Sequence, residues 1–250
     1  MSDDFYVGYL DRAPRPIGLF VRRVVVGVFL AVGVVAALLV AWQQPFGSGE
    51  FEFGRYRPFS GEIRERPYPE LVLHRETRGT APAVANLLLG EFGKSRPAEA
   101  VGKDGLRVRL RGALSYRGDA VTLELEAGSI ETIGEGSHRA PVEEDLGRQT
   151  LVGEIVDSKC YSGVMKPSTG KVHRSCAARC ISGGIAPLLV AEDSEGNVLL
   201  LLMVGSEGQA LTSEVLDFVA EPIRIEGRVI RRDSRLLLMA DLSSVERLGG

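Results

Sequence analysis

The pattern of hydrophobic and polar residues separates an apolar run near the N-terminus from a long region of alternating polarity. Residues 24–42, VVVGVFLAVGVVAALLVAW, contain no charged side chain. A helix of this length crosses the hydrocarbon core of a bilayer, because each residue adds about 1.5 Å. Trp42 closes the run, where interfacial aromatic residues lie. We therefore expect a transmembrane helix over residues 24–43.

The charges around this run predict its orientation. Four arginines precede it, and the next basic residue after it is Arg55. Because basic residues favour the cytoplasmic side, we expect a single-pass protein of the cell inner (cytoplasmic) membrane with its N-terminus in the cytoplasm. Residues 1–23 would form a cytoplasmic tail, residues 44–58 a connector, and the rest would be periplasmic. A cleaved signal peptide and a buried core helix are the alternatives.

Beyond the connector, one pattern of strands occurs twice. The sequence Gly-Glu-Ile stands near the start of both copies, at residues 61–63 and 153–155, and a leucine run ending in glycine follows in each. Apolar residues then alternate with charged ones, as in LRVRLRG (106–112) and PIRIEGRV (222–229). This alternation is typical of half-buried antiparallel strands. The repeat predicts a mainly β protein with two tandem OB-like five-stranded β-barrels.

The barrels are expected at residues 59–135 and 149–250, joined by a linker over residues 136–148 that is rich in glycine and acidic residues. In the second copy the pattern predicts three strands, one helix and two further strands, which is the order of an OB-fold. The predicted strands are 150–157, 187–192, 198–204, 223–231 and 235–242, and the predicted helix is 209–219.

All three cysteines lie in an insert between the first two strands of the second barrel, CYSGVMKPSTGKVHRSCAARC, residues 160–180. If residues 172–182 form a helix that ends at the following Gly-Gly pair, His173, Cys176 and Cys180 share one face. Cys160 reaches them through the intervening loop. Three thiolates and an imidazole form a soft ligand set. The sequence therefore predicts one metal site formed by these four residues.

The identity of the metal stays open among zinc, copper and an iron–sulfur cluster. Asp157 and Met165 are additional candidate ligands, through a carboxylate oxygen and a thioether sulfur. Asp157 can instead orient His173 or cap the end of the first strand. Basic side chains around the insert would favour thiolates. These are Lys159, Lys166, Lys171 and Arg174.

Two other kinds of thiol chemistry compete with a metal. A periplasmic location favours disulfides, and three cysteines leave at least one thiol free, ligated or bonded to another molecule. A redox-active pair of Cys176 and Cys180 is the other alternative. The two remaining histidines, His74 and His138, have no comparable set of ligands beside them in the sequence.

Composition argues against two further classes of function. The net charge is −3 and aromatic residues make up 6% of the chain, so it lacks the basic surface and stacking platforms of a nucleic-acid binder. The sequence has no phosphate-binding glycine loop, nucleophile elbow or HExxH helix. Because no acid–base pair accompanies the cysteines and histidine, we expect a non-catalytic subunit rather than an enzyme acting alone.

The segments GEIVDSKCYSGVM (153–165) and KVHRSCAARCISGGIAP (171–187) resemble a motif block of uncharacterised membrane-anchored bacterial proteins with OB-like domains. In that block the first cysteine, the H-x2-C-x3-C motif and the Gly-Gly pair occur together, over about residues 150–205 of this chain. The block has proline where this chain has Ala186, which affects one turn. The resemblance implies that the four candidate ligands form one unit, and it implies no particular activity.

These observations predict an extracytoplasmic metal-binding subunit anchored in the lipid bilayer. It would be an accessory or electron-transfer component of a membrane redox system, or a metal handler for one, with other membrane-protein subunits as partners. One alternative is a docking module whose Cys/His loop is held by zinc or a disulfide. The other is a thiol oxidoreductase.

Overall fold

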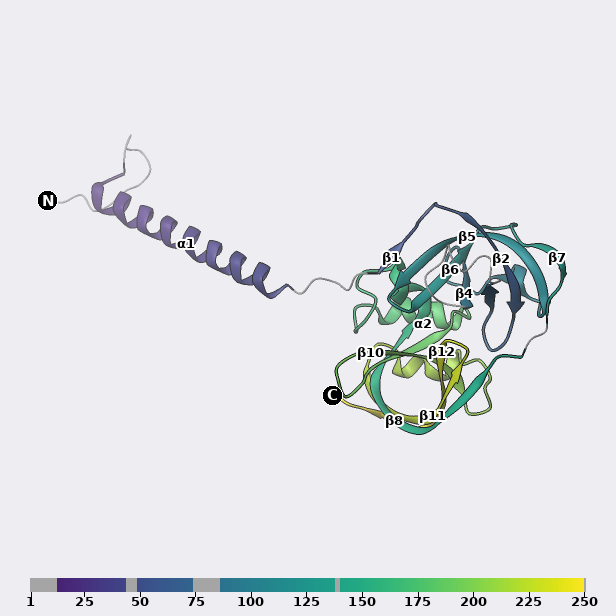
Figure 1. Ribbon diagram of the computed structural model, residues 1–250. Helices are drawn as coiled ribbons and strands as arrows, with labels where there is room; N and C mark the ends of the chain where they lie inside the picture. The colour runs from purple at the N-terminus through teal and green to yellow at the C-terminus, as the bar shows by residue number, and fades with distance from the viewer. Residues whose placement is uncertain (1–12, 44–48, 74–85, 138–139, 250) are drawn as a thin grey trace. The chain divides into compact units, whose positions relative to one another are not determined.

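The computed structural model describes residues 13–43, 49–73, 86–137 and 140–249, and the chain divides into two compact units (Figure 1). The first unit, Met1–Phe46, contains the helix α1, Arg15–Trp42. The second unit, Gly47–Gly250, contains all the described strands. The fold is thus mainly β, with one apolar helix near the N-terminus.

Helix α1 begins within the segment that was predicted to be the tail. Pro16 lies in its first turn, where proline is favourable because the missing N–H has no helical partner. Its side chains are exposed or half-buried, and residues 24–42 are apolar on all sides, a pattern found in helices that a protein core or a membrane covers. The helix is long and apolar enough to cross a membrane, and a signal sequence near the N-terminus would meet the same criteria.

The described part of the second unit contains twelve strands with short helices between them. In chain order they are β1 (Glu50–Phe51), β2 (Arg57–Arg64), β3 (Glu70–Leu73), β4 (Asn86–Glu91), η2 (Ala98–Ala100), β5 (Leu106–Arg117), β6 (Ala120–Leu125), β7 (Glu131–Glu135), β8 (Glu143–Asp157), η3 (Cys160–Val164), α2 (Arg174–Ser182), β9 (Pro187–Glu192), β10 (Val198–Gly205), η4 (Ser213–Phe218), β11 (Pro222–Arg232) and β12 (Arg235–Arg247).

These strands form two rings with the same connectivity. In the first ring the order is β2-β3-β4-β6-β5, and β5 pairs back with β2. The second ring is a closed barrel in the order β8-β9-β10-β12-β11, and β11 pairs back with β8. β4 and β6 are parallel in the first ring, and β10 and β12 are parallel in the second. All other neighbouring strands in the two rings are antiparallel. β1 and β7 pair with β5, so the first ring lies within a seven-stranded sheet.

Two elements of the second ring differ from the sequence prediction. The prediction of a helix over residues 209–219 is wrong, because only a short 3-10 helix, η4, forms there. The β-branched Val215 and Val219 are buried in the barrel, and such residues have low helix propensity. β8 begins at Glu143, before the predicted residue 150. This early part of β8 is exposed and carries charged residues that pair with arginines of β11, so it shows no apolar alternation.

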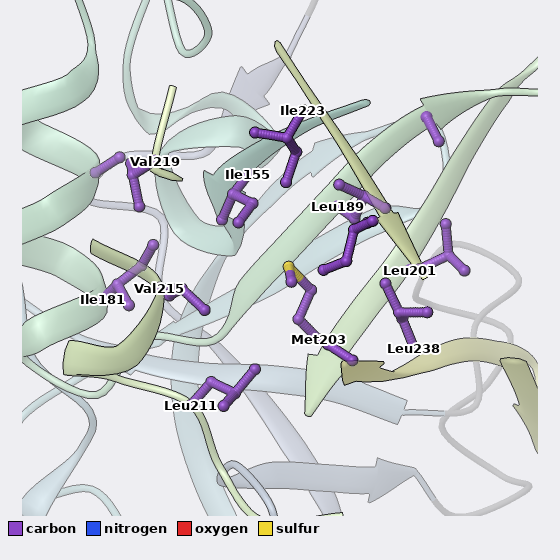
Figure 2. Packing of buried hydrophobic residues seen from close by; sticks show 14 of the residues in the cluster. Ile155, Ile181, Leu189, Leu201, Met203, Leu211, Val215, Val219, Ile223 and Leu238 are labelled. Atoms are coloured by element: carbon purple, nitrogen blue, oxygen red, sulfur yellow. The ribbon is translucent and has the colours of Figure 1, made fainter. Parts of the chain in front are cut away.

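The core of the second ring also holds the helix that carries two of the cysteines. Figure 2 shows Ile181 of α2, Val215 of η4 and Val219, the residue after η4, packed with side chains from the strands. The strand residues labelled there are Ile155, Leu189, Leu201, Met203, Ile223 and Leu238. Burying a large aliphatic side chain stabilises the fold by about 1.5–3 kcal/mol. Ile181 therefore fixes α2 against the barrel.

The two rings contact each other through buried polar groups. Tyr68, between β2 and β3, is 3% exposed, and its hydroxyl accepts the N–H of Leu211 at 2.7 Å. The same hydroxyl donates to the carbonyl of Met203 at 2.8 Å. Arg235 of β12 pairs with Glu70 of β3 at 2.7 Å. These contacts make one compact unit of the two rings.

Candidate metal centre

The connection from β8 to β9 holds all three cysteines and packs against the first ring. Its first turn, η3, follows β8 almost directly. Within that turn Gly163 has a φ of 149°, and a Cβ there would lie 2.5 Å from the carbonyl oxygen of Glu50 in β1. Glycine is therefore required at this close approach. Ser162 adds a hydrogen bond of 2.8 Å to Ser115 of β5.

Asp157, the last residue of β8, is completely buried and organises the start of the insert. Its Oδ1 accepts the backbone N–H of Cys160 at 2.8 Å, which fixes the η3 turn. Its Oδ2 lies 3.1 Å from Nε2 of His173. Both roles considered from the sequence, the cap at the end of a strand and the partner of His173, are therefore present in one carboxylate.

The structure brings the three cysteine sulfurs together. Sγ of Cys160 lies 3.7 Å from Sγ of Cys176 and 3.8 Å from Sγ of Cys180. All three residues are free thiols, and Cys160 and Cys180 are buried. The predicted helix is confirmed as α2, which places Cys176 and Cys180 one turn apart and ends before Gly183. Cys160 also forms a second triad with Asp157 and His173, whose ligand atoms lie within 4.8 Å of one another.

These distances fit ligands of one ion. Thiolates at about 2.3 Å from a tetrahedral zinc ion lie about 3.8 Å from each other. Cys160, Cys176, Cys180 and His173 thus lie close enough to hold a metal ion.

The contact between His173 and Asp157 is compatible with an imidazole that binds a metal. His173 is 3% exposed and stands at the N-terminus of α2. In the tautomer whose Nε2 donates to Asp157, the ring's Nδ1 keeps its lone pair and can act as the ligand atom. Metal-binding histidines usually donate their other N–H to a carboxylate in this way.

A lysine that sequence reasoning missed lies beside the sulfurs. Nζ of Lys94 is 2.7 Å from Sγ of Cys176 and 3.8 Å from Sγ of Cys180. Lys94 follows β4 in the first ring, and its backbone carbonyl packs directly against Gly183, where any Cβ would collide with it. No feature of the surrounding sequence, EFGKSR, distinguishes this lysine, because only the packing of the two rings brings it to the cysteines.

The basic residues expected to surround the thiols have other partners or lie in solvent. Nζ of Lys159 contacts Glu124 of β6 at 2.5 Å, and both side chains are buried. It also donates to the carbonyl oxygens of Glu91 and Gly93. Arg174 pairs with Glu221, and Lys166 and Lys171 are exposed. Among the basic residues that the structure describes, Lys94 is the one in contact with the sulfurs.

The remaining residues considered from the sequence are Met165 and the two other histidines. Met165 is 42% exposed, in contrast to the buried Cys160 and Cys180, and we draw no ligand role for it from its position. His74 and His138 lie outside the described residues.

The pKa values of groups in the cluster are shifted because these groups lie close together. The pKa of the Cys160 thiol is raised because it hydrogen-bonds to Cys180, because it is buried and because the carboxylate of Asp157 is close. The pKa of Lys94 is raised by its hydrogen bond to Cys176. Adjacent thiolates repel each other, so all three can ionise together only when a cation lies among them.

The chain matches no protein-family model, no curated protein and no solved structure at a significant level. The assignment of this centre therefore depends on its own geometry.

Proposed function

We propose that this chain is a membrane-anchored, extracytoplasmic metal-binding subunit. In this proposal Cys160, Cys176, Cys180 and His173 hold one metal ion, and Asp157 orients the imidazole. The separation of the sulfurs, 3.7 and 3.8 Å, is the observation that carries the proposal. It matches the spacing of thiolates around one tetrahedral ion.

Zinc is the ion that the site favours. Three thiolates, a neutral imidazole and Zn²⁺ carry a net charge of −1, and the ammonium group of Lys94 neutralises it. Four protein ligands leave no open position, which is typical of structural zinc sites. The ion would fix the insert between the two rings, and the protein would act as a docking module for other membrane subunits.

The surroundings of the site support this role. We propose that both rings are OB-like barrels, since their strand order and strand directions are those of a five-stranded Greek-key barrel. In OB-folds the connection between the first two strands borders the ligand-binding face, and the insert occupies that connection. We further propose that α1 is a retained anchor with the rings on the periplasmic side, because arginines precede the apolar run.

A second candidate function, thiol oxidation and reduction, is favoured by the contact between Lys94 and Cys176. An ammonium group at 2.7 Å stabilises a thiolate, and Cys176 is the most exposed of the three cysteines. In this case Cys176 would be the attacking thiolate, and a disulfide with Cys160 or Cys180 would be the oxidised product.

Elemental analysis with a free-thiol count distinguishes these functions. The full chain is purified from membranes without added metal, together with Cys176→Ser, His173→Ala and, as the control, Lys171→Ala at an exposed position of the insert. One equivalent of zinc, kept in the control and lost in Cys176→Ser, supports the docking module. One equivalent of copper instead supports an electron-transfer or metal-handling component. Metal-free protein with a reversible disulfide refutes the metal site and supports thiol chemistry.

A further inference from the structure

The insert differs in charge from the rest of the chain. Residues 158–184 contain five basic residues and no acidic one, although 33 of the chain's 250 residues are acidic. With its histidine neutral this stretch carries +5, so the other residues together carry −8 in a chain of net charge −3. Charge asymmetry of this kind indicates binding to a nucleic acid or a membrane. Since composition argues against nucleic acid, a membrane is the anionic partner to consider.

Part of this positive charge is neutralised inside the fold. Lys159 pairs with Glu124, and Arg174 pairs with Glu221. Lys166 and Lys171 are exposed, and neither forms an ion pair within the part of the chain that the structure describes. Both lie between η3 and α2. This connection therefore presents positive charge to a partner.

The same connection has an exposed apolar side chain beside each of these lysines. We call residues 165–172 the 165–172 loop. Met165 precedes Lys166 and is 42% exposed, and Val172 follows Lys171 and is 82% exposed. Segments that lie at a membrane interface combine basic groups, which reach the headgroups, with apolar groups, which enter the layer below them. The composition of the 165–172 loop fits this kind of contact.

The chain enters the second unit beside the start of this loop. Gly49, before β1, is buried against η3, and a Cβ there would lie 2.6 Å from Cα of Gly163. The 165–172 loop begins two residues after Gly163. Seven residues lead from Trp42, the last residue of α1, to Gly49, and seven extended residues span at most about 25 Å. When α1 is anchored in a bilayer, the linker thus keeps the start of the loop within reach of its surface.

We propose that the 165–172 loop binds anionic phospholipid headgroups of the bilayer in which α1 is anchored. Lys166 and Lys171 contact the phosphates, and Met165 and Val172 enter the interface below them. The inference rests on the proposed anchor, and it does not depend on the identity of the metal. This contact would hold the metal centre at the membrane surface, where other membrane subunits can reach it.

The test uses a single tryptophan on the loop. Val172→Trp is combined with Trp42→Phe, which removes the one native tryptophan, and the full chain is placed in lipid nanodiscs. The discs contain phosphatidylcholine with brominated acyl chains, alone or with phosphatidylglycerol in equal parts, because bromine quenches tryptophan on contact. We expect strong quenching in the anionic discs, weak quenching in the neutral discs, and less quenching at high salt. Equal quenching in both kinds of disc, or quenching in neither, would overturn the proposal.

Two further tryptophan positions test where the contact lies. Val198→Trp is the matched control, since Val198 is 57% exposed and pairs with Glu192, at the end of β9 away from the insert. It should not be quenched in either lipid. Met165→Trp probes the other end of the loop and should respond as Val172→Trp does. Equal quenching in the control and in the loop variants would overturn the proposal.

The lysines are tested by Lys166→Gln and Lys171→Gln in the chain that carries Val172→Trp. Each should lower the ratio of lipid-bound to unbound loop, measured by quenching in anionic discs, about fivefold. Unchanged quenching in the double variant would overturn the role of the lysines and with it the proposal.

The anchor is tested separately, by size-exclusion chromatography of the discs. A chain that does not stay with the discs refutes both the anchor and the contact that rests on it. A chain that stays with the discs without quenching at the loop refutes the contact alone.

Discussion

The two rings share one strand order but differ in the connection between their first and second strands. In the first ring, β2 passes to β3 through a short turn that carries Tyr68. In the second ring, β8 passes to β9 through the insert that contains all three cysteines and His173. The comparison separates two roles of the chain. Alternating apolar residues form the strands of both rings. The longer connection of the second ring contains the candidate metal ligands.

The largest loss of stability is expected where the insert contacts the first ring. Lys159→Met leaves Glu124 buried without its partner, since the two side chains are 2% and 4% exposed. We expect a loss of about 3–5 kcal/mol in the free energy of unfolding, measured by urea denaturation. The double variant Lys159→Met/Glu124→Leu should recover most of this loss. A single variant as stable as the wild type would show that the ion pair does not join insert and ring.

Removal of the metal should be the next largest effect. A ligand present at 100 to 1,000 times its Kd stabilises the folded state by about 2.7–4.1 kcal/mol, so a strong chelator should lower the Tm by several degrees. Cys180→Ala should start from the lower Tm and no longer respond to the chelator. Met165→Leu, at an exposed position of the insert, is the matched control and should respond like the wild type. An unchanged Tm in chelated wild-type protein would argue against a stabilising ion.

The short connection of the first ring should contribute less. Tyr68→Phe leaves the buried N–H of Leu211 without its acceptor, and we expect a loss of about 1–3 kcal/mol. Tyr116→Phe is the control, because its hydroxyl contacts Glu50 at the surface. Equal losses in both variants would contradict a special role for Tyr68 between the rings.

Burial of Tyr68 also predicts a dependence on alkaline pH. Because desolvation raises the pKa of its hydroxyl, the unfolded chain loses this proton before the folded protein does. The stabilisation is thus fully present below the ordinary tyrosine pKa of about 10 and is lost as the pH rises above it. Unfolding free energies of the wild type should fall more steeply above that pH than those of Tyr68→Phe. Parallel curves would contradict this origin.

The smallest effect is expected on the outer face of the second ring. Arg231 and Glu144 pair across β11 and β8 with half-exposed side chains. Arg231→Ala should cost less than about 1 kcal/mol, and added salt should reduce the difference. The free energy of unfolding, measured at low and at high salt, checks this. Arg228→Ala, which breaks a second exposed ion pair, is a further test. A loss comparable to that in Lys159→Met would mean that these charges hold the strands in register.

Sequence patterns predicted the parts of the site that depend on local geometry. The H-x2-C-x3-C spacing placed Cys176 and Cys180 on one face of a helix, and the position of Asp157 at a strand end suggested its contact with His173. Lys94 could not be predicted, because it comes from the other ring. The direction in which the Lys159 side chain points also depends on the packing of the two rings, since its partner Glu124 lies on β6. Alternation likewise predicted the strands with a buried face but missed the exposed start of β8.

X-ray absorption at the edge of the metal that copurifies with the full chain tests the central claim most directly. We predict about three sulfur neighbours at about 2.3 Å and one nitrogen neighbour at about 2.0 Å. Cys160→Ser should replace one sulfur by a lighter atom. A first shell made only of nitrogen and oxygen atoms, in folded protein, would contradict a metal centre built from Cys160, Cys176, Cys180 and His173.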